Sequence, residues 1–107
     1  MTGTYIRFYV QEKRRHNGIL LYEWLLEAAK GMGIQGGAAF RAIAGFGRHG
    51  VMREEHFFEL AGDLTVEVAF AVTEREADAL LDMARKENLD IFYVKSPAEF
   101  GVTGQRG

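Results

Sequence analysis

The chain has 107 residues, of which 48% are hydrophobic and 26% are charged, which is typical of one globular domain. Its formal net charge of −2 argues against a general nucleic-acid binder, because such proteins are usually basic. The absence of cysteine excludes disulfides and thiolate chemistry, and no apolar run approaches the roughly 20 residues that cross a bilayer.

The first predicted strand covers residues 4–10, TYIRFYV, which are rich in β-branched and aromatic side chains. Alternation gives it an apolar face and a mixed face. The apolar face consists of Ile6, Phe8 and Val10, and the mixed face of Tyr5, Arg7 and Tyr9. Nothing in the first ten residues resembles a signal peptide, so we expect a cytoplasmic protein without membrane insertion.

A polar connection over residues 11–18 contains a basic run, Lys13 to His16, and ends in a turn-forming Asn-Gly pair. We expect His16 to be solvated, and contact of the run with an anion is the alternative. Residues 19–33 follow as a helix. Its buried stripe is predicted from residues at helical spacing, namely Leu21, Trp24, Leu25, Ala28 and Met32. Flanking glycines favour a short second strand at 38–45, although its alanines also suit a helix.

Residues 64–72, LTVEVAFAV, alternate strictly and predict the third strand. The sequence Thr73-Glu74-Arg75-Glu76 then has the form of a capping box, which opens a second helix at 74–87. Residues 90–95 predict the fourth strand. We expect Pro97 to end that strand and residues 97–107 to form a flexible C-terminal tail.

The predicted order β-α-β-β-α-β indicates an α+β, ferredoxin-like sandwich in a single domain over residues 1–96. A four-stranded antiparallel sheet then carries both helices on one face. The other face holds the mixed side of the first strand and, from the second strand, Ala39, Arg41 and Ile43. The third strand is expected between the first and second, so Glu67 would lie near both Arg7 and Arg41.

A sheet face without helices predicts either burial against further copies of the chain or stacking of single-stranded RNA on its aromatic residues. The net charge of −2 and the absence of a basic-aromatic segment favour self-association over RNA. Simple solvation of the face in a monomer is the third alternative, which the small apolar residues Ala69, Ala71 and Ile43 disfavour.

An ordered set of motifs over residues 18–47 resembles the PII-like family known as domain of unknown function 190. The set comprises Leu21-Tyr22-Glu23, Gly37-Ala38, Arg41 and Gly45-Phe46-Gly47. The resemblance implies a homotrimer whose three sheets line the centre. It also implies a signalling role: an adenine nucleotide binds between subunits, and the loop after the second strand regulates a membrane channel, a transporter or an enzyme.

The loop after the second strand supplies most of the candidate ligand residues. Glycine amides can form an anion nest, arginine pairs well with phosphate, and an aromatic ring can stack on a base. We expect AMP, ADP, ATP or a related anion to be held by Arg41, Gly45, Phe46, Gly47, Arg48 and Arg53. The glycines are explained equally well by a turn, and residues 85–90, RKENLD, lack the glycines of the PII phosphate loop.

Two alternatives stay open. His49 and His56, with acidic neighbours, are weak candidates for a metal site in a trimer of the copper-tolerance (CutA) type. A module that binds a protein partner without a small ligand is the other. We expect no enzymatic activity, because no nucleophile has a base and an orienting group beside it in the sequence.

Overall fold

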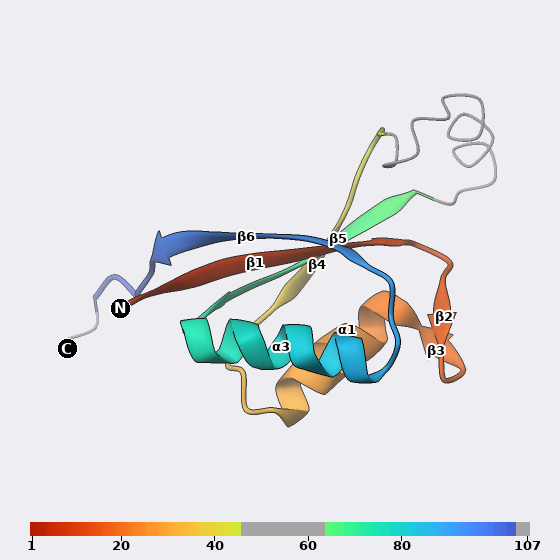
Figure 1. The fold of residues 1–107 in the computed structure, drawn as a ribbon. Helices are drawn as coiled ribbons and strands as arrows, with labels where there is room; N and C mark the ends of the chain where they lie inside the picture. Colours follow the sequence, from red (N-terminus) through yellow and green to blue (C-terminus); the bar gives the residue numbers. More distant parts are fainter. Residues whose placement is uncertain (46–63, 105–107) are drawn as a thin grey trace.

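The computed structural model describes residues 1–45 and 64–104 as an α+β fold with a four-stranded antiparallel sheet, as predicted (Figure 1). The elements are β1 (Thr2–Gln11), β2 (Arg15–His16), β3 (Ile19–Leu20), α1 (Leu21–Gly31), β4 (Ala38–Arg41), β5 (Thr65–Val72), α3 (Glu74–Lys86) and β6 (Phe92–Glu99).

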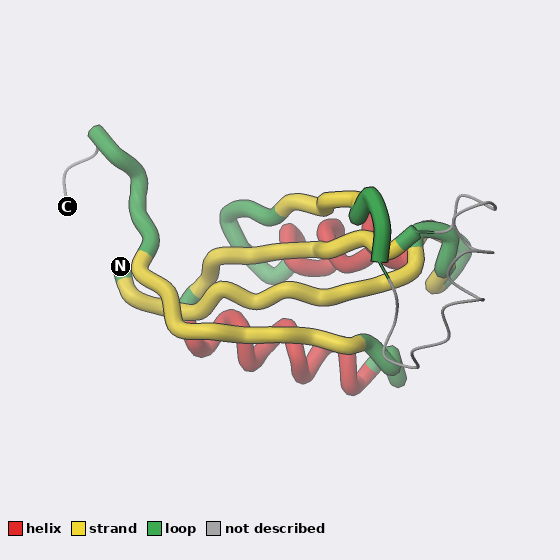
Figure 2. The backbone as a smooth tube through the Cα atoms, turned by 90° about the horizontal axis from the view of Figure 1, so that it is seen from above, coloured by secondary structure: helices red, strands yellow, loops and turns green. Residues whose placement is uncertain are grey.

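The strands of the main sheet lie in the order β4-β5-β1-β6, and every neighbouring pair is antiparallel. The third predicted strand, β5, therefore lies between the first and the second, as the ferredoxin-like order requires. Helices α1 and α3 both lie on one side of the sheet (Figure 1). Figure 2 views the sheet from its other side, where the four strands lie in front of both helices.

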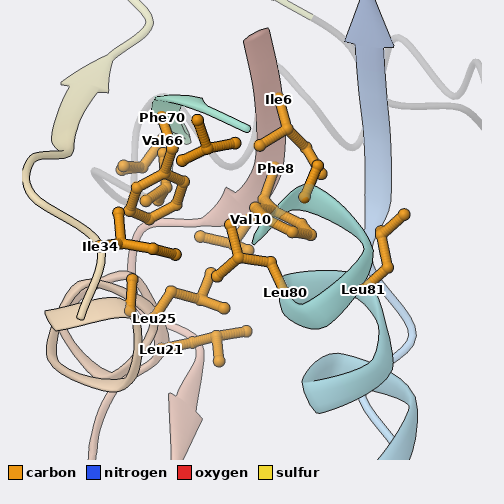
Figure 3. Close-up of a cluster of buried hydrophobic side chains, with 14 residues drawn as sticks. Ile6, Phe8, Val10, Leu21, Leu25, Ile34, Val66, Phe70, Leu80 and Leu81 are labelled. Carbon is orange, nitrogen blue, oxygen red and sulfur yellow. The ribbon is translucent and has the colours of Figure 1, made fainter. Parts of the chain in front are cut away.

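The hydrophobic core fills the layer between the helices and the sheet (Figure 3). Strand β1 contributes Ile6, Phe8 and Val10, as its alternation predicts. The core is closed by alternate residues of β5 and by the buried stripes of the two helices. These residues include Val66, Val68, Phe70, Val72, Leu21, Leu25, Ala29, Ala77, Leu80 and Leu81.

Helix α3 begins with the predicted capping box. The Thr73 hydroxyl accepts a hydrogen bond from the Glu76 amide at 3.1 Å, and the Glu76 carboxylate accepts one from the Thr73 amide at 3.0 Å. Asn88, just past the helix, adopts a φ of 57°, the left-handed conformation that asparagine tolerates at a helix end. Within the described part of the chain, no helix has the length and apolar character needed to cross a bilayer.

Helix α1 begins at Leu21, two residues later than the predicted helix. Ile19 and Leu20 pair instead with Arg15 and His16 in a small hairpin. Asn17 and Gly18 form its turn with φ values of 52° and 85°, which suit an Asn-Gly hairpin turn. At the other end, Met32 is exposed rather than part of the buried stripe.

Strand β4 is shorter than predicted, and its residues face the opposite sides of the sheet from those predicted. Ala39 and Arg41 lie across from the buried residues Val68 and Val66, so they are on the helix side of the sheet. Phe40, paired with Glu67, is the residue of β4 that joins the uncovered face. The predicted placement of Ala39 and Arg41 on that face is therefore wrong, and Ile43, also predicted there, lies beyond the end of β4. Apolar residues occupy both odd and even positions of β4, so alternation in the sequence could not show which side of the strand faces the helices.

Strand β6 continues past Pro97 to Glu99, where the sequence predicted an end. Pro97 lies opposite Thr4 of β1, and β6 is an edge strand of the sheet. Proline is tolerated at such an edge because its missing N–H removes no bond when that position faces away from the neighbour. The C-terminal half of β6 thereby pairs with the beginning of β1.

Gly37 precedes β4 and allows the chain to pass close to the core. A Cβ atom at this position would overlap the Phe70 ring, which is fully buried, whereas one at Gly36 would have nothing within 4 Å. We expect Gly37→Ala to lower the free energy of unfolding by about 1–3 kcal/mol through overpacking. The matched variant Gly36→Ala should change it by less than about 1 kcal/mol, in either direction.

Urea denaturation of both glycine variants checks this prediction. Equal midpoints for Gly36→Ala and Gly37→Ala would contradict it.

Candidate functional site

Two of the predicted ligand residues lie within the described chain. Arg41 ends β4 at the edge of the sheet, and Gly45 follows four residues later on the surface. The other predicted site residues lie outside the described residues: Phe46, Gly47, Arg48 and Arg53, together with the weak metal candidates His49 and His56.

The Arg41 guanidinium is held by the Glu12 carboxylate, which belongs to the residue just past the end of β1. The Arg41 side chain is 63% exposed, whereas that of Glu12 is only 17% exposed. Most of the Arg41 side chain is therefore exposed to solvent while Glu12 holds its guanidinium. Glu12, and not the expected Glu67, is its acidic partner. A phosphate could compete for this guanidinium, because phosphate and carboxylate use the same donors.

The basic run that follows Glu12 makes hydrogen bonds within the small hairpin and to the rest of the domain. Arg14 donates to the Asp90 carbonyl at 3.0 Å and Arg15 to the Gly18 carbonyl at 3.1 Å. His16 contacts the Glu87 carboxylate at 2.9 Å and lies edge-on to Trp24, with ring centroids 4.6 Å apart. The expectation that His16 is solvated is wrong, since it joins the hairpin to the end of α3.

The uncovered side of the sheet forms the second candidate site, here called the open sheet face. Its residues come from all four strands and include Tyr5, Arg7, Tyr9, Phe40, Glu67, Ala69, Phe92 and Val94. Phe40 is 54% exposed and Phe92 is 44% exposed, which is unusual for phenylalanine. The alternation of β1 and β5 predicts their residues on this face correctly, whereas neither phenylalanine was predicted to lie there.

Arg7 lies at the centre of this face among aromatic rings. Its guanidinium carbon is 5.2 Å from the centroid of the Tyr5 ring, within the range of a cation–π contact. Its Nε atom is buried and has no hydrogen-bond partner among the described residues. Arg7 is thus partly desolvated without full compensation, which costs free energy in the isolated chain.

Tyr9 and Glu67 are direct cross-strand neighbours on the same face, and the Tyr9 hydroxyl donates to the Glu67 carboxylate. The ring of Tyr9 also contacts Phe92, with centroids 5.8 Å apart. Burial raises the pKa of Tyr9 above its ordinary value of 10.0, and the bond to Glu67 and the negative charge of Glu67 raise it further. Arg7 partly offsets this increase.

The raised pKa of Tyr9 predicts a late step in the tyrosinate absorbance titration of the folded protein. Tyr9→Phe should remove this step, while Tyr93→Phe should leave it. Because the folded state holds the proton more tightly, the contribution of Tyr9 to stability is complete below the unfolded pKa of about 10 and is lost as the pH rises through the folded pKa. A late step that survives in Tyr9→Phe would contradict the assignment.

Within the described residues, no group of three or more histidine, cysteine, aspartate or glutamate side chains lies close enough together to hold a metal ion. What the described chain offers is an anchored arginine at one sheet edge and an aromatic face with a half-buried arginine.

Comparison with known proteins supports the resemblance found in the sequence. A family model for DUF190, described as "Uncharacterized ACR", matches residues 3–92. A UPF0166 protein of Aquifex aeolicus (strain VF5) is 34% identical over 77 residues, which cover 72% of this chain and 73% of the relative. The family match runs from the second residue of β1 to the first residue of β6, so it includes both helices and strands β4 and β5 but not most of β6. The chain belongs to the DUF190 family.

Proposed function

We propose that the protein is a cytoplasmic, PII-like regulatory protein that assembles as a homotrimer through its open sheet face and has no enzymatic activity of its own. One observation carries the proposal: helices α1 and α3 cover the same side of the sheet, and the other side presents two exposed phenylalanines and an arginine whose Nε is buried without a partner among the described residues. Aromatic residues and arginine are enriched in the cores of protein interfaces. Burial against further copies would remove this surface from water.

The ligand in this proposal is an adenine nucleotide or a related anion, bound in the cleft between adjacent subunits. Arg41 supports this reading because it ends the edge strand β4 and because its side chain is largely exposed. Guanidinium groups bind phosphate oxygens with two parallel hydrogen bonds. Binding would alter the segment that follows β4, and that segment would then contact a channel, a transporter or an enzyme.

Calorimetric titration with AMP, ADP, ATP and cyclic dinucleotides tests the ligand assignment. We expect at least one of them to bind, and Arg41→Ala to weaken that binding by about tenfold or more, as loss of a charged contact does. Arg75→Ala, which removes an exposed arginine from the first turn of α3, serves as the matched control and should bind normally. The absence of heat with every nucleotide would contradict the proposed ligand.

A further inference from the structure

The open sheet face keeps its cation and its carboxylate apart within one chain. Arg7 lies opposite Ala69 and Glu67 lies opposite Tyr9, so the two charged residues are diagonal neighbours on β1 and β5. None of the ion pairs within the described residues joins them. Arg7 instead lies against the Tyr5 ring, and Glu67 accepts from the Tyr9 hydroxyl.

Both charged groups retain unused hydrogen-bonding capacity. A guanidinium has five N–H donors, and the buried Arg7 Nε has no partner among the described residues. A carboxylate has about four acceptor positions, of which the Tyr9 hydroxyl uses one. A carboxylate from another chain can pair with the terminal nitrogens of the Arg7 guanidinium, and a guanidinium from another chain can pair with Glu67.

The face is complementary to itself, which identifies a second copy of this chain as its occupant. It combines one cation and one anion with aromatic and small residues, so two such faces can place opposite charges together. A single-stranded nucleic acid is disfavoured, because the face lacks the row of cations that would follow a phosphate backbone.

The rest of the sheet is protected against pairing. Strand β6, at one edge, carries Lys95 and Pro97, and both residue types oppose the addition of a further strand. Strand β4, at the other edge, has only four residues. Face-to-face contact is therefore favoured over edge-to-edge pairing.

We infer that Arg7 of each subunit pairs with Glu67 of a neighbouring copy across the open sheet face. The pair gives each guanidinium a partner of opposite charge and fixes the orientation of the contacting sheets. This inference rests on the self-association in the proposed function, but it does not depend on a nucleotide. It predicts that association requires opposite charges at these two positions, whichever residue carries which sign.

Sedimentation velocity of the full chain over a range of concentrations tests the pair by charge exchange. We expect Arg7→Glu and Glu67→Arg each to weaken association by about 30-fold or more, because each places like charges in contact. The double variant Arg7→Glu/Glu67→Arg should regain association to within a few-fold of the wild type. Single variants that associate normally, or a double variant weaker than both, would overturn the pair.

Milder substitutions cover the case in which a charge reversal prevents folding. Arg7→Gln and Glu67→Gln should each weaken association, and the double variant should be no weaker than the poorer single variant, because one interaction is removed in all three. If the fold-changes of the two single variants multiply in the double variant, the two residues act independently and the inference is overturned. A monomeric wild type would overturn both the pair and the proposed trimer, whereas normal association without nucleotide binding would affect only the proposed ligand.

Discussion

Replacing Phe8 with alanine is expected to lower the free energy of unfolding by about 3–5 kcal/mol, as phenylalanine truncations in cores do. Phe8 is 1% exposed and is among the largest fully buried side chains of the described structure. It lies between the two helices and packs edge-on against Phe70, with ring centroids 6.4 Å apart (Figure 3). The free energy of unfolding of native domains is about 5–15 kcal/mol in total, so this loss would remove a large share of the stability.

Urea denaturation measures the effect, provided that the slope with denaturant stays constant. Ile43→Ala is the control, because Ile43 is 96% exposed and should change stability by no more than about 0.5 kcal/mol. A loss below about 1 kcal/mol for Phe8→Ala would mean that the core does not close around this residue.

Replacing Phe40 with lysine is expected to raise the dissociation constant of the assembly by about 30-fold or more. Phe40 projects from β4 onto the open sheet face opposite Glu67. If that face is the subunit interface, the substitution replaces a buried aromatic ring with a strongly hydrated cation. Loss of an aromatic anchor at an interface costs about 2 kcal/mol or more, and each 1.4 kcal/mol is about tenfold in affinity.

The matched control for this variant is Met32→Lys, which introduces the same charge at an exposed apolar residue beyond the end of α1. Sedimentation should show species near three times the 12.0 kDa chain mass for the wild type and for Met32→Lys, with dissociation for Phe40→Lys. Equal association of the two variants would exclude the open sheet face as the interface.

Some residues of the candidate site could be predicted from local sequence, whereas others depend on how the strands pair. The mixed character of Tyr5, Arg7 and Tyr9 was readable because β1 alternates over its whole length. Phe40 was missed because β4 has four residues, and its alanines fit either face of the sheet. Glu12 was missed as the partner of Arg41 because the two residues meet only after β1 and β4 have been placed in one sheet.

The positions at which strands and helices begin and end also depended on pairing between strands. Pro97 indicates a strand end on local grounds, yet β6 continues because its pairing with Thr4 does not require a proline N–H. Ile19 and Leu20 fit a helical pattern, yet they pair with β2 because the Asn-Gly turn brings them opposite Arg15 and His16.

The sequence by itself determined the order of the four main strands and the two helices that cover them, the apolar faces of β1 and β5, the capping box of α3 and the ferredoxin-like class. These features follow from periodicity and from hydrogen bonds between residues close in the chain. Only the tertiary structure decided which side of β4 faces the helices, where β6 ends and which carboxylate holds Arg41. The physical reason is that pairing between strands fixes side-chain direction through residues far apart in sequence, and a shift of one residue reverses every face.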